Sequence, residues 1–344
     1  MVHAMARSVA NDRAMGALAG VALGDAMGMP SQTLSRADIR GHYGRIEGFT
    51  APFIGHPASH GLMAGQVTDD TEQTLLLAGL LTRLGGFNDK DWAAALLDWE
   101  ADVRARNLRD LLGPSSKAAL KALIAGVPPS QTGRTGTTNG AAMRIVPVGI
   151  ANPVVGDTLV DAVEAACRVT HATGEAIAAA AAVAMVISLG VSGARFEDTL
   201  EHALKAAQFG NMRGAPVGER DMPGRIAQAL DIATAGDEAR LAARIGTSVA
   251  SRESVATAFG VVRLAGGDPW SAAVIAANIG DDTDTIGAIA CGMAGACSGL
   301  GAFPVDRLAE LQAANDFDLG AVASDLLRLR FDQALAPVTG AGAA

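Results

Sequence analysis

The chain has 344 residues, of which 49% are hydrophobic, 18% charged and only 4% aromatic, and its formal net charge is −9 at pH 7. Abundant small residues and few aromatics favour closely packed helices over a β-rich fold, in which Val, Ile, Tyr and Phe would dominate. The acidic balance, without any basic run, argues against a partner that is nucleic acid.

Helical periodicity dominates the chain, and convincing strand alternation is absent. The pattern predicts an all-α fold in a single domain that spans 1–344, with frayed tails at 1–10 and 335–344. Helices are predicted, in chain order, at 11–24, 71–84, 91–102, 115–125, 158–169, 174–189, 196–208, 224–235, 237–245, 254–264, 269–277, 285–300 and 305–314. Irregular segments rich in glycine, proline and polar residues are predicted at 30–68, 125–138 and 209–223.

The longest apolar run, at 176–190, is shorter than the ~20 residues that a membrane-spanning helix needs, so it predicts the buried central helix of a bundle. Asp12 and Arg13 interrupt the amino-terminal segment, which therefore does not resemble a signal peptide. The cysteines are Cys167, Cys291 and Cys297, and none belongs to a CxxC pair. An odd, sparse set predicts free thiols and a cytoplasmic protein. The shortness of the apolar run predicts no membrane partner.

The first acidic motif is Thr68-Asp69-Asp70-Thr71, directly before the helix predicted at 71–84. Threonine and aspartate are favoured helix caps, and acids suit the positive end of the helix dipole, so capping is one interpretation. One acid would satisfy that need. Two adjacent aspartates between two threonines offer carboxylate and hydroxyl oxygens that suit a hard cation.

The second acidic motif is 278–285, Asn-Ile-Gly-Asp-Asp-Thr-Asp-Thr, again directly before an apolar helix. A cap with a polar turn is the alternative here as well. Three aspartates within four residues raise one another's pKa unless a cation neutralises them. If the two helix starts face each other, the ligands are all hard oxygens, which favours Mg²⁺, Mn²⁺ or Ca²⁺ over Zn²⁺.

Three further features are expected near such a site. Asp25, in the glycine-flanked segment 20–30, reaches a ligand or caps a turn. The small-residue loop 136–144, Gly-Thr-Thr-Asn-Gly-Ala-Ala-Met-Arg, lets backbone N–H groups approach a phosphate. His171 opens the apolar helix predicted at 174–189, where it either contacts the ligand or is a structural residue.

These motifs, together with 144–149 and 169–177, occur in the order of the ADP-ribosylglycohydrolases, and the chain resembles that family from about residue 14 to about residue 304. The resemblance implies a compact orthogonal helical bundle with a binuclear metal centre that holds two Mg²⁺ or Mn²⁺ ions. The implied metal ligands are Thr68, Asp69, Asp70, Asp282, Asp284 and Thr285. Asp281 stands where the family usually has glycine and is left out of this set.

The expected substrate-binding residues combine the resemblance with the features above. They are Asp25, Gln32, Asp110, Thr138, Asn139, Gly140, Met143 and His171. Asp110 matches a family aspartate only loosely, because Ser115 and Ser116 follow it in place of threonine. Gln32 stands where many members carry a glutamate near the metals and the scissile ribose, and an amide donates hydrogen bonds but does not accept a proton.

The resemblance implies metal-assisted hydrolysis of an ADP-ribosyl bond, with a small or protein-attached substrate. The ions would orient the ribose diol and lower the pKa of a bound water toward about 7. Asp69, Asp70, Asp282 or Asp284 would accept the proton of that water, and carboxylates would stabilise an oxocarbenium-like transition state.

Two alternatives are kept. An N-ribosidase acting on a small nucleoside-like metabolite is suggested by Gln32 and by the short, glycine-rich loop 30–68. A non-catalytic member, as lens crystallins of the family are thought to be, conflicts with two intact acidic motifs.

Overall fold

A computed structural model of the chain describes residues 2–108, 112–155 and 157–335; Asp110 and the predicted tail after residue 335 lie outside these ranges. Over the described residues the chain forms 18 α-helices, and its only extended pairings are isolated bridges, which confirms the all-α prediction. The helices are α1 (Val2–Gly28), α2 (Arg36–Tyr43), α3 (Asp69–Leu84), α4 (Asp89–Ala105), α5 (Pro114–Ile124), α6 (Pro129–Thr132), α7 (Gly140–Met143), α8 (Val146–Ala151), α9 (Thr158–Cys167), α10 (Gly174–Val191), α11 (Phe196–Asn211), α12 (Met222–Thr234), α13 (Glu238–Ile245), α14 (Ser251–Leu264), α15 (Pro269–Ala277), α16 (Thr283–Ser298), α17 (Val305–Ala314) and α18 (Leu319–Leu335), with 3-10 turns η1 (Met29–Ser31) and η3 (Leu300–Ala302).

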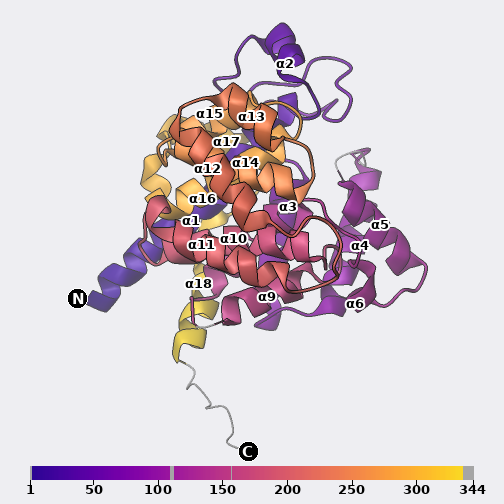
Figure 1. The fold of residues 1–344 in the computed structure, drawn as a ribbon, viewed down its shortest axis with the longest axis vertical. Coiled ribbons are helices and arrows are strands. Elements are labelled where there is room, and N and C mark those ends of the chain that lie inside the picture. Colours follow the sequence, from indigo (N-terminus) through magenta and orange to yellow (C-terminus); the bar gives the residue numbers. More distant parts are fainter. Residues whose placement is uncertain (1, 109–111, 156, 336–344) are drawn as a thin grey trace, which may run out of the picture.

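The helix α10 lies in the middle of the molecule, among α1, α11, α14 and α16 (Figure 1). It is long and apolar enough to be considered as a membrane span, but 94% of it is buried inside the protein. Every residue from Gly174 to Ser188 is buried, which confirms the predicted central helix. Its many alanines let neighbouring helices approach it closely from all sides.

A very close helix contact joins α1 and α16, which run antiparallel along a stripe of glycines. Cβ atoms built on Gly20, Gly24 and Gly28 would lie 2.1–2.3 Å from backbone oxygens of α16. Real Cβ atoms do not approach so closely, so only glycine permits this packing. The contact fixes the carboxyl-terminal end of α1 beside Asp284 in the first turn of α16.

Several segments differ from the sequence prediction. The short helices α6, α7 and α8 form where no helix is predicted, α6 inside the stretch 125–138. The structure extends α1 back to Val2, through the segment predicted as a frayed tail, because α18 packs beside it: the Arg7 guanidinium lies 4.9 Å from the Phe331 ring. The helix α18 was not predicted, although Asp318 caps it by accepting a hydrogen bond from Ala321 N. Helix α2 forms inside the stretch predicted to be irregular and, with its loop, stands apart from the main body in Figure 1.

Candidate active site

The two acidic helix starts lie side by side. Asp69 begins α3, Asp282 is the N-cap of α16, and Asp284 follows in the first turn of α16. The hydroxyl Oγ1 of Thr285 lies 3.4 Å from Asp70 Oδ2, although these residues are 215 positions apart. The carboxyl groups that the sequence placed at opposite ends of the chain therefore share one region of the protein.

A cleft of about 140 Å³ opens at this junction. It is lined by Gln32, Thr33, Ala58, Asp69, Leu112, Gly113, Pro114, Ser116, Thr138, Asn139, Gly140, Met143, Val249, Asp282, Asp284 and Thr285. Most of the predicted site residues are in this lining. Thr68 and Asp70 are buried beside it rather than in its wall, and the predicted residue Asp110 lies outside the described part of the chain.

Asp25 does not line the cleft, although it was predicted to contact a ligand. Its fully buried carboxylate accepts hydrogen bonds from the backbone N–H and the hydroxyl of Thr68, at 2.8–3.0 Å, and from those of Thr71, at 3.1 and 2.5 Å. These bonds attach the start of α3 to α1. Since α1 also packs against α16, Asp25 and the glycine stripe together hold the two acidic helix starts next to each other.

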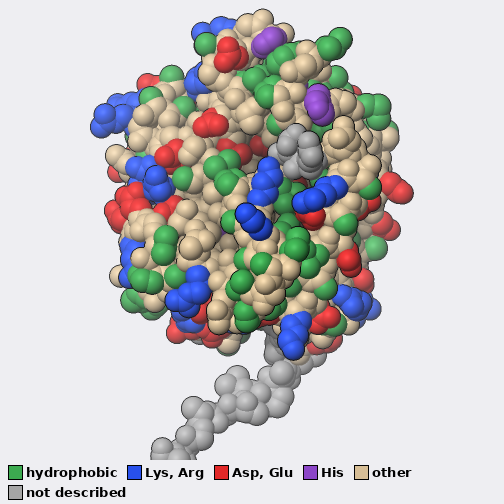
Figure 2. Space-filling model, turned by 90° about the vertical axis from the view of Figure 1, so that its right-hand side faces the viewer, with side chains coloured by type: hydrophobic (Ala, Val, Ile, Leu, Met, Phe, Trp, Pro, Cys, Tyr) green, Lys and Arg blue, Asp and Glu red, His purple; other side chains and the backbone are tan. Residues whose placement is uncertain are grey.

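The site carries more buried acid than its surroundings neutralise. Burial first, and then neighbouring carboxylates, raise the pKa of Asp69, Asp70 and Asp284 well above the usual value. Burial also raises the pKa of half-buried Asp282 to about 7 and that of Asp25 to about 6. On the face shown in Figure 2, by contrast, acidic and basic side chains are interspersed.

The donor set fits a hard divalent cation in its chemistry. Asp70 Oδ1 is buried and has no hydrogen-bond partner, which is costly for a carboxylate oxygen unless a cation meets it. Carboxylate and hydroxyl oxygens are the ligands that Mg²⁺ and Mn²⁺ prefer. In the described ranges, however, no three His, Cys, Asp or Glu side chains converge on a single point as a ligand set. The expectation that a metal binds here therefore rests on the buried carboxyl groups and on the type of ligand atoms they offer.

The loop 136–140 forms one wall of the cleft. Asn139 Nδ2 donates to Asp282 Oδ2 and, at 2.9 Å, to Ser254 Oγ, so it fixes the Asp282 carboxylate. A Cβ on Gly140 would lie 2.9 Å from the His171 ring, which explains glycine at this position. His171 was predicted to bind substrate but does not line the cleft: it is fully buried behind the loop, and its Nε2 lies 3.0 Å from Thr138 Oγ1.

The opposite wall is a strained pair of segments. Thr33 (φ 67°) and Asp281 (φ 62°) adopt left-handed backbone conformations, and Thr33 N donates to Asp281 O at 2.7 Å. Such conformations in residues other than glycine cost energy and concentrate at functional sites. Each adjoins a cleft residue, namely Gln32 and Asp282. The Gln32 side chain is 8% exposed, and its Nε2 has no partner.

Several lining residues escaped the sequence prediction. Val249 reaches the cleft because the bridge between Thr138 and Ala250 draws the loop before α14 against the loop 136–140. Ala58 comes from the loop after α2, Leu112 and Gly113 precede α5, and Pro114 begins α5. None has a chemical signature of its own. Of these, only Ala58 lies in a segment, 30–68, whose glycines and prolines predicted an irregular loop.

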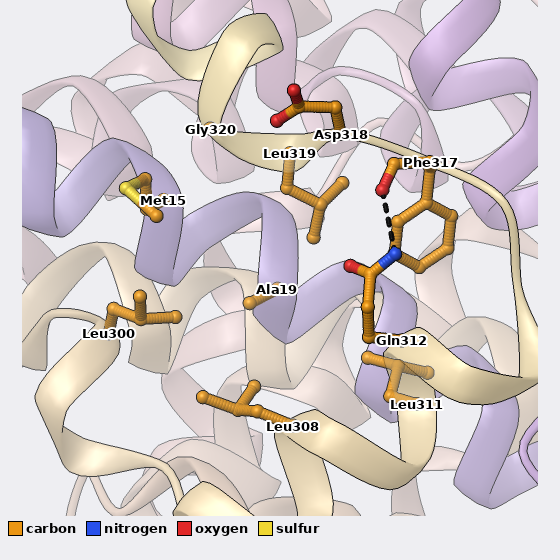
Figure 3. Close-up of a pocket in the computed structure, with 10 residues that line it drawn as sticks. All are labelled: Met15, Ala19, Leu300, Leu308, Leu311, Gln312, Phe317, Asp318, Leu319 and Gly320. Atoms are coloured by element: carbon orange, nitrogen blue, oxygen red, sulfur yellow. Dashed lines mark hydrogen bonds between the residues drawn. The ribbon is translucent and has the colours of Figure 1, made fainter.

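A larger cavity of about 520 Å³ lies elsewhere, between α1, α17 and the start of α18. In Figure 3 the apolar side chains of Met15, Leu308 and Leu319 surround it, and Gln312 Nε2 donates to Phe317 O at 3.0 Å. Its one carboxylate belongs to Asp318, which is already engaged as the cap of α18. The larger cavity thus lacks the reactive groups that gather in the smaller cleft.

Comparison with known proteins covers nearly the whole chain. A family model described as ADP-ribosylglycohydrolase matches residues 6–335. The chain is 35% identical over 326 residues to the uncharacterized protein YegU of Escherichia coli K12, covering 93% of this chain and 97% of that one. It is 28% identical over 314 residues to ADP-ribosylarginine hydrolase Tri1 of Pseudomonas putida, covering 85% and 72%. A solved structure described as an ADP-ribosylglycohydrolase-related protein complex matches with a TM-score of 0.70 and 27% identity, covering 94% and 99%.

Proposed function

Because the chain belongs to the ADP-ribosylglycohydrolase family, we propose that it is a divalent-metal-dependent hydrolase that cleaves an ADP-ribosyl bond in the cleft between α3 and α16. The observation that carries this proposal is the cluster of four buried or half-buried carboxyl groups, Asp69, Asp70, Asp282 and Asp284, at two apposed helix starts. The family supplies the class of reaction, and the cluster supplies groups that can perform it.

The proposed ligands of two Mg²⁺ or Mn²⁺ ions are Thr68, Asp69, Asp70, Asp282, Asp284 and Thr285. Bound ions would orient the ribose diol and lower the pKa of a water toward about 7. The unpartnered Asp70 Oδ1 and the raised carboxyl pKa values support a cation here, because both are relieved by a positive charge.

The side chains of the cleft have separate roles in this proposal. A carboxylate of the acidic cluster accepts the proton of the attacking water, and the negative cluster stabilises the oxocarbenium-like transition state. Asn139 holds Asp282 in place, and Asp25 holds the start of α3. The Gln32 amide, which does not exchange a proton as a carboxyl group would, donates a hydrogen bond to a substrate oxygen.

Two substrates are considered. The Pseudomonas relative is named for ADP-ribosylarginine, which makes a protein-linked ADP-ribosyl group the first candidate. The small cleft favours a second candidate, a nucleoside-like metabolite, because about 140 Å³ is below the roughly 300–1,000 Å³ of typical ligand pockets. A non-catalytic role is the third interpretation, and a titration that detects no Mg²⁺ or Mn²⁺ binding would favour it. The cytoplasmic location stays a prediction.

The test is a hydrolysis panel with ADP-ribosyl-arginine, ADP-ribosyl-serine peptide and free nucleosides, with Mg²⁺, with Mn²⁺ and with a chelator. We expect turnover of one ADP-ribosyl substrate that the chelator abolishes. Asp282→Asn should lose metal binding and turnover together, whereas Asp281→Asn should retain both, because the Asp281 side chain is outside the cleft and asparagine tolerates its backbone conformation. Full activity of Asp282→Asn would refute the assignment.

A further inference from the structure

A chain of buried hydrogen bonds connects Asp69, at the start of α3, with Thr138 in the loop 136–140, and Arg144 is at its centre. The Arg144 side chain is 1% exposed and lies beneath the acidic cluster, 5.5 Å from the Trp92 ring. Its Nη1 donates to Gln73 Oε1 at 2.7 Å, and its Nη2 donates to Thr170 Oγ1. Since a guanidinium has five donors and no acceptor, it fixes the direction of every hydrogen bond that begins at it.

One branch leads to Asp69. The Gln73 oxygen is engaged by Arg144, so the amide nitrogen must face the other way, where it donates to Asp69 Oδ2 at 3.2 Å. Arg144 thereby decides the orientation of the Gln73 amide. This branch therefore ends at the Asp69 carboxylate, which lines the cleft and which the Gln73 amide holds as a hydrogen-bond acceptor.

The other branch passes through His171. Its Nδ1 lies 2.7 Å from Thr170 Oγ1 and 3.4 Å from Arg144 Nη2. Because Thr170 Oγ1 receives the Arg144 N–H, its own proton is available to Nδ1, whereas a proton on Nδ1 would face the guanidinium. Nδ1 is therefore an acceptor, and the neutral ring carries its proton on Nε2. Burial and then the charge of Arg144 lower the pKa of His171 well below its usual value and keep the ring neutral.

The Nε2–H of His171 then donates to Thr138 Oγ1, 3.0 Å away. Among the described residues, His171 is the hydrogen-bond partner of this hydroxyl, so the proton of Thr138 is free to point into the cleft that Thr138 lines. We propose that Arg144 is a positioning residue that sets both branches, so that the cleft presents a carboxylate acceptor at Asp69 and a hydroxyl donor at Thr138. The Thr138 hydroxyl selects a substrate oxygen that accepts a hydrogen bond. This part of the proposal, which concerns the substrate, rests on the proposed function.

The relay itself is tested without any substrate. We expect ¹⁵N NMR of His171, assigned by comparison with His171→Gln, to show protonated Nε2 and unprotonated Nδ1 at about pH 7. Arg144→Met, where it folds, should shift the ring toward the other tautomer or a mixture. A protonated Nδ1 in the wild-type protein would overturn the relay, whatever the protein hydrolyses.

The donor at Thr138 is tested by calorimetric titration with ADP-ribose and Mg²⁺. Thr138→Val should bind ADP-ribose about tenfold more weakly, while Thr138→Ser, which keeps the hydroxyl, should stay within about twofold of wild type. Thr199→Val is the control for loss of a threonine hydroxyl, because the buried Thr199 donates to Phe196 O within α11, far from the relay in the chain. Wild-type affinity in Thr138→Val would contradict the proposed donor.

The link between Arg144 and Thr138 is tested by combining variants. Thr138→Val added to Arg144→Met should cost no further affinity, because the relay is already broken. Independent, additive losses would show that Thr138 acts without Arg144 and would overturn the positioning role. A wild-type protein that does not bind ADP-ribose would refute the proposed function, and the His171 tautomer would still decide the relay.

Discussion

Replacing Gly24 by alanine tests whether the glycine stripe of α1 positions the active site. The new Cβ would lie 2.1 Å from Gly287 O, whereas ordinary contact begins near 3.4 Å, so α1 and α16 must separate by about 1.3 Å. The atoms that the new Cβ would meet belong to the backbone and cannot rotate away. The first turn of α16 carries Asp284 and Thr285, so the separation moves one acidic helix start away from Asp25 and α3.

Overpacking of this kind costs about 1–3 kcal/mol, partly offset by the roughly 1 kcal/mol that alanine gains over glycine in a helix. At about 2.1 cal/mol/K per residue, 344 residues give an unfolding entropy near 0.7 kcal/mol/K, so we expect a Tm lower by at most about 3 °C. Activity should fall far more, by up to about 100-fold, because a 1 Å misplacement of reacting groups has that effect.

The assays are thermal unfolding and metal-dependent hydrolysis of the substrate that the panel identifies. Gly79→Ala is the matched control: Gly79 is exposed on α3, a Cβ added there would meet nothing within 4 Å, and alanine should raise stability and leave activity unchanged. A Gly24→Ala protein with wild-type turnover would refute the claim that the α1–α16 contact positions the site.

The buried charges give three further predictions. Adding Mg²⁺ or Mn²⁺ at about 100 times its Kd should raise the Tm by about 4 °C, and Asp284→Asn should remove most of that shift; an equal shift in the variant would place the ion elsewhere. The metal-free protein should lose stability as the pH rises from about 4 to about 7. Folding raises the pKa of the buried carboxyl groups, to about 7 for Asp282, so these groups favour the folded state only while they are protonated. Thermal scans in which stability rises over that pH range would contradict the pKa directions. Arg330→Met should lower the free energy of unfolding in urea by about 3–5 kcal/mol, since the buried Arg330 donates hydrogen bonds to Gly149, Ile150, Asn152 and Ser188. The control Arg328→Met, at an exposed position, should change it little. Equal effects of the two variants would show that the Arg330 hydrogen bonds do not hold α18 in place.

The sequence predicted the acidic helix starts because their signal is local. Thr68-Asp69-Asp70 and Asp282-Thr283-Asp284 stand directly before strongly apolar helices, and both are found at helix starts in α3 and α16. The small-residue loop was predicted in the same way, and its named residues Thr138, Asn139, Gly140 and Met143 all line the cleft. The two acidic motifs together, in this order, also pointed to the family.

The role of Asp25 is visible only in the folded protein. In the sequence Asp25 is an acid between glycines, which suits a ligand or a turn. In the structure both of its carboxylate oxygens accept hydrogen bonds from Thr68 and Thr71. The same holds for His171, because Arg144 and Thr170 decide which of its ring nitrogens donates a hydrogen bond and which accepts one. It also holds for Val249, which lines the cleft but has no chemical signature in the sequence. Each role depends on a neighbour that is distant in the chain, so no local pattern reveals it.

The amino-acid order alone determined that the chain is helical, where most helices begin, and which residues can bind a hard cation, because helix periodicity, capping and side-chain chemistry act within a few residues. Only the tertiary structure decided that α1 packs along α16 so closely that Cβ atoms on Gly20, Gly24 and Gly28 would lie 2.1–2.3 Å from backbone oxygens. It also decided that Asp25 ties α3 to α1 and that Arg144 hydrogen-bonds to both Gln73 and Thr170. Those contacts join residues separated by tens to hundreds of positions, and they form only when burial of the apolar faces brings the helices together.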